Sequence, residues 1–441
     1  MARKMKDSGI EWIGEIPEGW EIKYFVQLFS QVKNKNIGLR EKNLLSLSYG
    51  KIKQKSIETV GGLLPDSFEG YNIIDRNDIV LRLTDLQNDQ HSLRVGLSHE
   101  RGIITSAYCS IRVRGAESPN YLYYYLHTFD IAKGFYGMGS GVRQGLNWDG
   151  LKYIKILLPP QHEQDRISVF LNQKTLEIDS MLSKTISSIE EYKKLKQAVI
   201  TQAITKGVRG ERKMKDSGVE WIGEIPREWD LIKATRIIKS TQNGLTRRNL
   251  EKSDGQIVLK LKNITADGKI DYTYQNRIAL SSKELESYAL SSGDFLFVRV
   301  NGSKTLVGKC AIFNPIGESV AYNDHIIRVK LSNYCYSKFF FWYLCSSCGK
   351  AEIDLHTSTA AGQYTISGEG LRDINFVFPA LSEQTEIANY LDAKCAEIDR
   401  LIAKKEQLVK ELESYKKSLI YEVVTGKREI FTDITRKFPN I

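Results

Sequence analysis

The stretch GSKTLVGKC at 302–310 is the part of this sequence that comes nearest to a phosphate-binding loop. Its two glycines, Gly302 and Gly308, stand one residue too far apart for such a loop. Cys310 also follows the lysine, where a Ser or Thr hydroxyl would hold Mg²⁺. The glycines of GMGSGVRQG at 137–145 likewise miss the spacing of a dinucleotide-binding turn. Both stretches therefore predict turns rather than nucleotide sites.

Cys345 and Cys348 form a single CxxC pair in an aromatic segment. A zinc site needs a second such pair or histidines at the right spacing, so a buried structural role is expected for these cysteines. The six histidines are scattered, and the motifs of serine hydrolases, zinc proteases and kinases are missing from the sequence. We also find no Pro-Pro-Tyr/Phe motif for adenine methylation and no acidic pair followed by Glu-x-Lys for phosphodiester cleavage. The sequence predicts no catalytic residue and no metal site.

Two clusters of polar side chains that follow strands have the chemistry for contacting nucleic acid. Arg, Asn, Gln and Thr can hydrogen-bond to base edges, whereas Lys mainly contacts phosphates. In the first half of the chain the candidates are Lys51, Lys53, Gln54, Arg82, Thr84, Gln87, Asn88, Arg143 and Gln144. In the second half they are Lys260, Lys262, Asn263, Arg299, Asn301, Ser303, Lys304 and Gln363. For any one of them alone, a solvated loop side chain is the more common role, but two clusters at corresponding places favour DNA contact.

The composition is compatible with such a partner. The chain has 63 Lys and Arg against 53 Asp and Glu, a formal charge of +10 and a pI near 9.0. This charge suits a polyanion, although mild basicity is also common among proteins that bind none. The six cysteines form no dense framework, which indicates a reducing compartment. No apolar run resembles a signal peptide or membrane span, so we expect a cytoplasmic soluble protein.

The segments that must position these residues form internal repeats in the sequence. MKDSGIEWIGEIPEGW at 5–20 returns as MKDSGVEWIGEIPREW at 214–229, with thirteen of sixteen residues identical. A second repeat aligns 158–207 with 378–427 without a gap and matches Gln164 to Gln384. The chain is therefore a tandem of two similar parts, each with a short motif, a globular stretch and a long segment.

Both long segments have the apolar periodicity of a coiled coil. The seam residues are Leu171, Ile178, Leu182 and Ile189 in the first segment and Leu391, Ile398, Ile402 and Val409 in the second. Proline is absent from 161–206 and 380–428, and Gly207 and Gly426 are expected to end the helices. A lone helix cannot bury its own apolar stripe, and the simplest partner for each helix is its repeat. We therefore expect the two helices to pair antiparallel within the chain. Packing of each helix on its own globular part, or pairing with a second chain, are the alternatives.

The globular stretches 20–158 and 229–378 share an order of expected elements. Each has an early strand (44–49 and 257–264), an Asp before an apolar strand with an Arg (78–82 and 294–299), a further strand (103–114 and 319–331), an aromatic helix, a glycine-bearing loop and a strand that ends in Pro. The loops between these elements differ freely. The sequence therefore predicts an α+β protein with two α/β domains that share one scaffold and differ in surface chemistry.

The repeated MKDSG.EWIGEIP..W motif, the tandem layout and the paired helices resemble the specificity (S) subunit of Type I restriction–modification systems, over essentially the whole chain. The resemblance implies two target-recognition domains in a pseudo-two-fold tandem repeat, separated by a long antiparallel two-helix coiled coil. The expected bounds are a repeat motif at 1–20, a target-recognition domain at 21–158, a central long helix at 159–208, a second motif at 209–229, a second target-recognition domain at 230–378, a C-terminal long helix at 379–428 and a tail at 429–441.

The resemblance also implies what the chain does and what it leaves to its partners. A specificity subunit is not catalytic: it reads a bipartite, asymmetric site in double-stranded DNA and joins two methyltransferase (M) subunits to restriction (R) subunits. S-adenosylmethionine, ATP and Mg²⁺ would then act through those partners, and this chain would bind no cofactor. A two-domain scaffold for a ligand other than DNA, or an orphan variant or decoy of the specificity subunit, remain alternatives.

Overall fold

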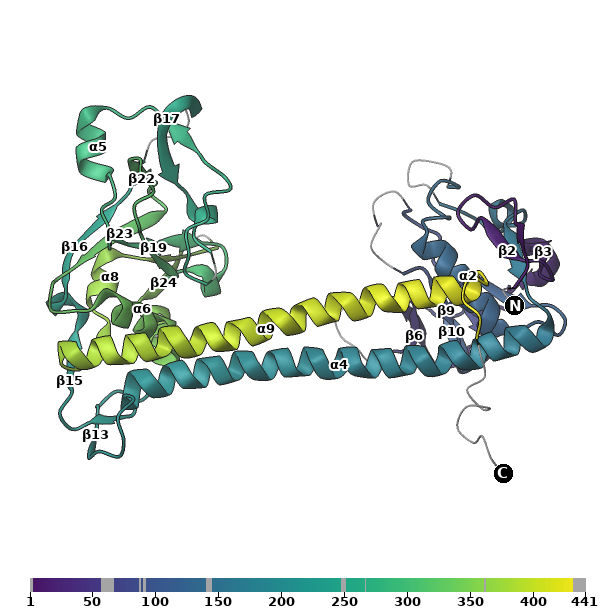
Figure 1. The fold of residues 1–441 in the computed structure, drawn as a ribbon, viewed down its shortest axis with the longest axis horizontal. Coiled ribbons are helices and arrows are strands. Elements are labelled where there is room, and N and C mark those ends of the chain that lie inside the picture. The colour runs from purple at the N-terminus through teal and green to yellow at the C-terminus, as the bar shows by residue number, and fades with distance from the viewer. Residues whose placement is uncertain are drawn as a thin grey trace. The chain divides into compact units, whose positions relative to one another are not determined.

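The computed structural model of the protein describes residues 3–56, 67–86, 89, 93–139, 145–246, 251–265, 267–360 and 362–430. The chain divides into two compact units. Unit 1 consists of residues 1–186 and 407–441, and unit 2 of residues 187–406. Each unit thus holds one globular stretch, one copy of the repeated motif and one half of each long helix (Figure 1).

The repeated motif folds as a small β-hairpin in both units. In unit 1, β1 (Met5–Asp7) pairs with β2 (Glu15–Pro17), and in unit 2, β13 (Met214–Asp216) pairs with β14 (Glu224–Pro226) in the same register. Glycine is required in the turn, because Gly14 and Gly223 both adopt a positive φ, of 73° and 68°. Behind each hairpin a tryptophan, Trp20 or Trp229, is 1% exposed, so the motif is anchored by its apolar residues.

Each globular stretch begins and ends in one antiparallel ladder. In unit 1, β3 (Glu21–Tyr24) pairs with β12 (Lys155–Leu158), and in unit 2, β15 (Asp230–Lys233) pairs with β26 (Asn375–Phe378). The strand that enters the stretch therefore lies beside the strand that leaves it and leads into the long helix.

A four-stranded antiparallel sheet of the same order forms the centre of each unit. In unit 1 the order is β4 (Phe29–Gln31), β11 (Cys109–Val113), β8 (Ile79–Leu81) and β9 (Val95–Leu97). In unit 2 it is β16 (Ile238–Asn243), β23 (Ile326–Leu331), β19 (Phe295–Val298) and β21 (Cys310–Ile312). The pair Ile79–Leu97 corresponds to Phe295–Ile312, and all four side chains are buried or half-buried. The predicted α+β fold class, with two domains of one scaffold, is confirmed.

Two of the predicted strands are wrong in extent, because a turn divides each of them. The expected strand 103–114 consists of β10 (Gly102–Ile104), which pairs with β7 (Asn72–Ile74), and of β11 in the central sheet. The expected strand 319–331 consists of β22 (Val320–Tyr322), which pairs with β17 (Glu251–Leu259), and of β23. Turns closed by Tyr108 N–H to the Thr105 carbonyl, and by Ile326 N–H to the Asn323 carbonyl, move the chain between sheets.

The early strands also differ from the expected ranges: the first is shorter, and the second begins and ends earlier in the chain. The segment 44–49 gives β5 (Leu45–Ser48), which forms a hairpin with β6 (Lys51–Gln54), and 257–264 gives the end of β17 followed by the 3₁₀ turn η2 (Leu261–Asn263). The remaining short elements are α1 (Phe25–Leu28), α3 (Trp148–Leu151), η1 (Ala234–Arg236), β18 (Arg277–Ile278), α5 (Ser282–Tyr288), β20 (Val300–Asn301), η3 (Lys304–Leu306), β24 (Thr357–Ala360), β25 (Gln363–Ile366) and α8 (Gly368–Arg372).

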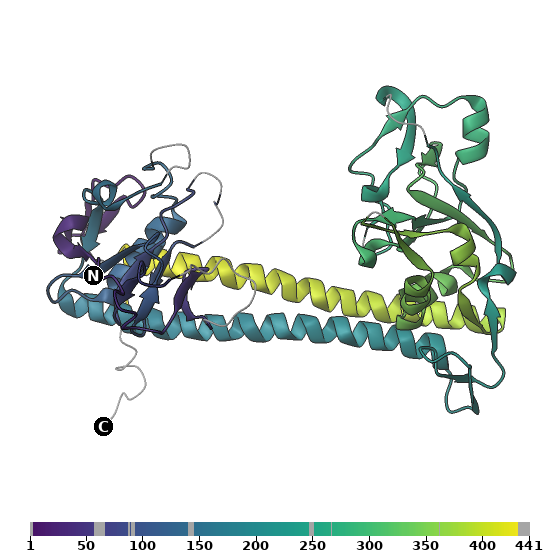
Figure 2. The ribbon, with the colours of Figure 1, turned by 180° about the vertical axis from the view of Figure 1, so that it is seen from behind.

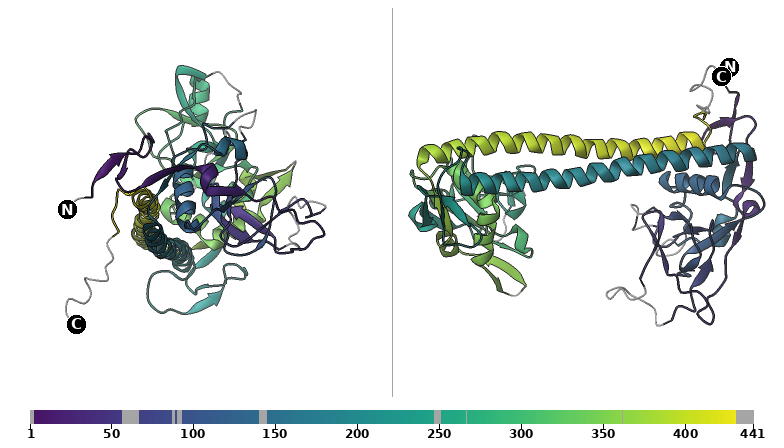
Figure 3. Two further views of the ribbon diagram at one scale, coloured as in Figure 1. Left: turned by 90° about the vertical axis from the view of Figure 1, so that its right-hand side faces the viewer. Right: turned by 90° about the horizontal axis from the view of Figure 1, so that it is seen from below.

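The aromatic helices attach each globular stretch to a long helix. In unit 1, α2 (Pro119–Ile131) lies against α4 (Gln161–Lys206) (Figure 3). The Tyr124 hydroxyl donates to Asn172 Oδ1 at 2.9 Å. In unit 2, α6 (Ser337–Cys345) lies against α9 (Leu381–Val424) (Figure 2). Trp342 Nε1 donates to Asp392 Oδ1 at 2.9 Å. The short helix α7 (Ser347–Leu355) follows α6 directly.

The long helices α4 and α9 run antiparallel in each unit. In unit 1 the Lys416 ammonium lies 2.5 Å from the Asp179 carboxylate, and in unit 2 the Lys196 ammonium lies 2.7 Å from the Asp399 carboxylate. Of the expected seam residues, Leu171, Ile178, Ile189, Leu391 and Ile398 are buried, and Leu182, Ile402 and Val409 are half-buried. The stripes also pack on the globular parts, since Leu171 and Trp20 share one core. Among the described helices none is long and apolar enough to span a membrane.

Candidate nucleic-acid interface

The β5–β6 hairpin presents the first group of expected DNA contacts. Lys53 and Gln54 are exposed, and Tyr49 in the turn between the strands is 78% exposed. Lys51 differs from them, because its ammonium donates to the Asp179 carboxylate on α4 at 2.8 Å. The hairpin thus offers Lys53, Gln54 and Tyr49 to solvent, and Lys51, whose side chain is still 61% exposed, ties it to the long helix.

The chain after β8 holds the second group in unit 1. The Arg82 guanidinium is one-third exposed and lies 3.4 Å from the Asp89 carboxylate. Thr84 is exposed, and the backbone of Asp85 adopts a φ of 56°, which is uncommon for a residue other than glycine. The expected contacts Gln87, Asn88, Arg143 and Gln144 lie outside the described residues.

In unit 2 the segment after β17 is arranged around Asn263, which is 2% exposed. Its Nδ2 donates to the carbonyls of Asp271 and Tyr274, both at 2.8 Å, and its Oδ1 accepts from the Lys260 N–H at 2.9 Å. The structure therefore gives Asn263 the role of holding a loop in place. Lys262 is the more accessible neighbour, and its ammonium lies 4.7 Å from the centre of the exposed Tyr274 ring.

The structure brings the remaining candidates of unit 2 around the small sheet β20–β25–β24. Asn301 on β20 pairs with β25, the strand that begins with the exposed Gln363. Asn301 Oδ1 accepts from the Ser303 N–H at 2.9 Å, which shapes the turn before η3. Lys304 in η3 is exposed and lies 3.8 Å from the Asp354 carboxylate.

Arg299 and Arg82 do not occupy equivalent positions. The Arg82 N–H donates to the Arg94 carbonyl, whereas the corresponding bond in unit 2 runs from the Val298 N–H to the Lys309 carbonyl. Val298 is therefore the counterpart of Arg82, and Arg299 follows it directly after the end of β19. The Arg299 guanidinium donates to the Asp324 carbonyl at 3.0 Å.

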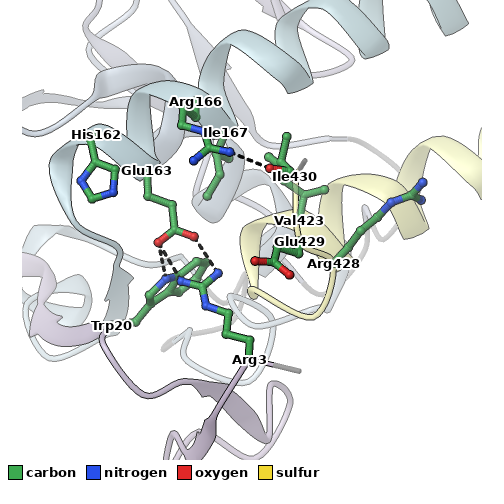
Figure 4. A pocket seen from close by; sticks show the side chains of 10 residues that line it. All are labelled: Arg3, Trp20, His162, Glu163, Arg166, Ile167, Val423, Arg428, Glu429 and Ile430. Atoms are coloured by element: carbon green, nitrogen blue, oxygen red, sulfur yellow. Dashed lines mark hydrogen bonds and ion pairs between the residues drawn. The ribbon is translucent and has the colours of Figure 1, made fainter. Parts of the chain in front are cut away.

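A repeated cluster of Arg, Glu and Trp, which the sequence did not predict, fixes each motif to the start of a long helix. In unit 1 the Arg3 guanidinium bonds both oxygens of Glu163 at 2.7 and 2.8 Å, and Trp20 Nε1 donates to the same carboxylate at 2.9 Å (Figure 4). Burial alone would raise the pKa of Glu163, but the hydrogen bonds from Arg3 and Trp20 outweigh it and lower this pKa.

The second copy of the cluster lies in unit 2. Arg212 lies 2.7 Å from Glu383, and Trp229 Nε1 donates to this carboxylate at 3.0 Å. The Glu383 side chain is 4% exposed, against 19% for Glu163. In unit 1 a cavity of about 250 Å³ adjoins the cluster, lined among others by Arg3, Arg166 and Ile430 (Figure 4).

The cysteines and histidines of the described residues form no site of three or more metal ligands with Asp or Glu. Cys348 is buried and its thiol donates to the Trp221 carbonyl at 3.1 Å, which is a structural contact. Burial raises the pKa of the Cys345 thiol to about 11, so this cysteine stays protonated near neutral pH. The exposed side chains described in the two units can donate and accept hydrogen bonds and carry positive charge.

Comparison with known proteins identifies a domain family within the chain. The sequence model of the Type I restriction modification DNA specificity domain matches residues 226–412. The chain is 25% identical over 329 residues to the Type I restriction enzyme StySPI specificity subunit of Salmonella potsdam, covering 73% of this chain and 68% of that protein. It is 24% identical over 423 residues to the MjaVIII specificity subunit of Methanocaldococcus jannaschii, covering 93% of both.

A solved structure has the same fold. It comes from work on the complex assembly and conformational transition of the type I R-M system, and it matches with a TM-score of 0.69 at 14% identity, covering 94% of this chain and 99% of the other. At this identity the match supports the fold alone. Together with the matches in sequence, it confirms the resemblance drawn from the repeated motif.

Proposed function

We propose that this chain, which carries a Type I restriction modification DNA specificity domain at 226–412, is the DNA sequence-specificity subunit of a Type I complex. In this proposal it reads a two-part, asymmetric site in double-stranded DNA. The observation that carries the proposal is the duplication: two units have one sheet order and different loops. A symmetric reader presents the same side chains twice and reads a palindrome, whereas two different loop sets read two different half-sites.

The differences between the loops support this asymmetry. The connection between β8 and β9 covers 82–94 and contains Arg94, which is fully buried. The corresponding connection in unit 2 covers 299–309 and contains β20 and η3, with a half-buried Lys309 at its end. The two connections follow equivalent strands, so the scaffold is shared while the surface offered to a ligand is not.

The proposed division of labour leaves the chemistry to other subunits. This chain would join two methyltransferase subunits and the restriction subunits, and would have no catalytic activity and no cofactor of its own. The names of the relatives support this, since they are specificity subunits of restriction enzymes. S-adenosylmethionine, ATP and Mg²⁺ would be bound by those partners. The cytoplasm is the proposed place of action.

Binding of the purified full-length chain to duplex DNA tests the proposal first. Affinity should fall steeply as salt rises, because Lys and Arg displace counterions from phosphates. Selection from a randomised duplex library should then give two short conserved sequences separated by an unread spacer. A chain that binds partner subunits and no DNA would instead be a scaffold for another ligand. A chain that binds DNA and supports no methylation with its partners would be a decoy.

A further inference from the structure

Arg94 is the largest charged side chain that is fully buried among the described residues of unit 1, with 0% of the residue exposed. It stands directly before β9, and its backbone N–H donates to the buried Asp130 carboxylate at 2.7 Å. An arginine cannot lose its charge in a protein, so burial is tolerated only when the guanidinium N–H groups all find acceptors. The contacts of this side chain therefore show what it holds.

Most hydrogen bonds of the Arg94 guanidinium go to backbone carbonyls of the loop after β8. Nη1 donates to the carbonyls of Arg82 at 3.1 Å and Thr84 at 2.9 Å. Nη2 donates to the carbonyl of Asp85 at 3.2 Å and to that of Asp89. Nε donates to the Tyr136 hydroxyl at 3.2 Å, and the guanidinium lies 5.1 Å from the centre of that ring. One side chain thus fixes four carbonyls across eight residues of backbone.

This loop carries two of the side chains that face solvent where unit 1 would read DNA, Arg82 and Thr84. Their carbonyls are among the four that Arg94 holds, so the direction of both side chains follows from that anchor. The φ of 56° at Asp85, between them and the rest of the loop, is a conformation that a non-glycine residue keeps only where its surroundings enforce it.

Unit 2 has no equivalent among its described residues. The position of Arg94 is taken by Lys309, which is half-buried. A lysine has a point charge and cannot spread planar donors over four carbonyls. Within the described parts of the chain, the Arg94 contacts therefore occur in unit 1 only. Their loss should affect only the half of a DNA site that unit 1 would read.

We propose that Arg94 is a positioning residue for DNA reading by unit 1: it sets the loop that aims Arg82 and Thr84 at bases and touches no DNA itself. The inference rests on the proposed function. It makes Arg94 a determinant of sequence preference at one half-site, in the way that residues behind a binding surface fix the geometry of those at the surface.

Arg94→Lys in the full-length chain, copurified with its methyltransferase partners, tests this inference. The readout is the sequence of methylated sites. Loss of the planar fork should weaken the preference for the unit 1 half-site about tenfold, the effect of losing one good base contact. The unit 2 half-site should keep its full preference. Arg372→Lys is the matched control: Arg372 also donates to carbonyls, those of Ile238 and Lys239, but they belong to the unit 2 scaffold. It should leave both half-sites unchanged.

A milder variant keeps the test decisive if Arg94→Lys does not fold. Tyr136→Phe removes the acceptor of Arg94 Nε and the bond from the Tyr136 hydroxyl to the Asp89 carbonyl at 3.4 Å, but it leaves the four carbonyl contacts of the guanidinium in place, so it should weaken the same half-site to a smaller extent. Unchanged preference in a folded Arg94→Lys protein, or equal relaxation of both half-sites, overturns the inference and leaves the proposed function standing. If Arg94→Lys does not fold, unchanged preference in Tyr136→Phe does the same. A wild-type complex that marks no specific sequence removes both.

Discussion

The two Arg–Glu–Trp clusters should differ in strength, and this difference can be measured within one molecule. Glu383→Gln keeps an acceptor for Trp229 Nε1 and removes the charge that faces Arg212. Because the Glu383 and Arg212 side chains are only 4% and 12% exposed, the guanidinium left behind is poorly hydrated. Arg212 does retain Glu228 at 3.0 Å. We therefore expect a loss of about 3 kcal/mol in unit 2, the lower end of the range for breaking a buried ion pair.

Glu163→Gln is the matched variant in unit 1. Its partner Arg3 has a side chain that is 30% exposed, so water can replace much of the lost interaction. We expect a loss of about 1 kcal/mol, near the upper limit for a pair accessible to solvent. The two variants make the same chemical change at equivalent positions and differ mainly in burial.

Hydrogen exchange measured by mass spectrometry separates the two effects, because it reports opening of each hairpin by itself. A loss of about 3 kcal/mol should speed exchange at 214–229 by about a hundredfold in Glu383→Gln. Exchange at 5–20 should rise about fivefold in Glu163→Gln. Equal effects in the two variants, or a larger effect in Glu163→Gln, would refute the assignment of strength to burial.

Three further outcomes are expected. Burial raises the pKa of Asp130 to about 6, so folding of the wild type should gain stability as the pH falls from 7 to 4, by up to about 3 kcal/mol relative to Asp130→Asn in denaturant titrations. Gly426→Ala should destabilise unit 1 by more than Gly14→Ala in the same titrations: both glycines have a positive φ, but the added Cβ lies 2.5 Å from Pro17 at Gly426 and meets nothing within 4 Å at Gly14. Lys262→Ala should weaken binding to all DNA sequences alike and reduce the salt slope by about 1, checked by titration at several salt concentrations.

The fold was largely predictable because its main signals are local or repeated. The spacing of Leu171 and Ile178 predicts a helix from neighbouring residues alone, and the copied motif predicts two equivalent units. The prediction of a single strand at 103–114 and at 319–331 was wrong for a related reason. The apolar alternation continues through a turn, and only pairing with a distant strand decides where the chain leaves the sheet. The sequence of β10 alone does not predict that β10 pairs with β7.

The candidate site was less predictable because its geometry depends on contacts between distant residues. Asn263 looks like a base reader in sequence, yet its amide is consumed by two carbonyls of a loop that follows it. Arg94 looks like one more basic residue, and only the folded chain brings four carbonyls to it. The Glu163 and Glu383 clusters did leave a signal, since both glutamates precede the matched glutamines and an Arg precedes each motif.

The central claim is that each unit reads its own half-site independently of the other. A variant that carries the globular stretch of unit 2 in both units tests this claim most directly. The ladders β3–β12 and β15–β26 give matched junctions, so residues 25–154 can be replaced by residues 234–374 in the full-length chain. The sequences that this variant selects from a randomised duplex library should consist of two copies of one half-site, the half-site read by unit 2 in the wild type. An unchanged asymmetric site, or a site in which the unit 2 half is also altered, would contradict the account of two independent readers on one scaffold.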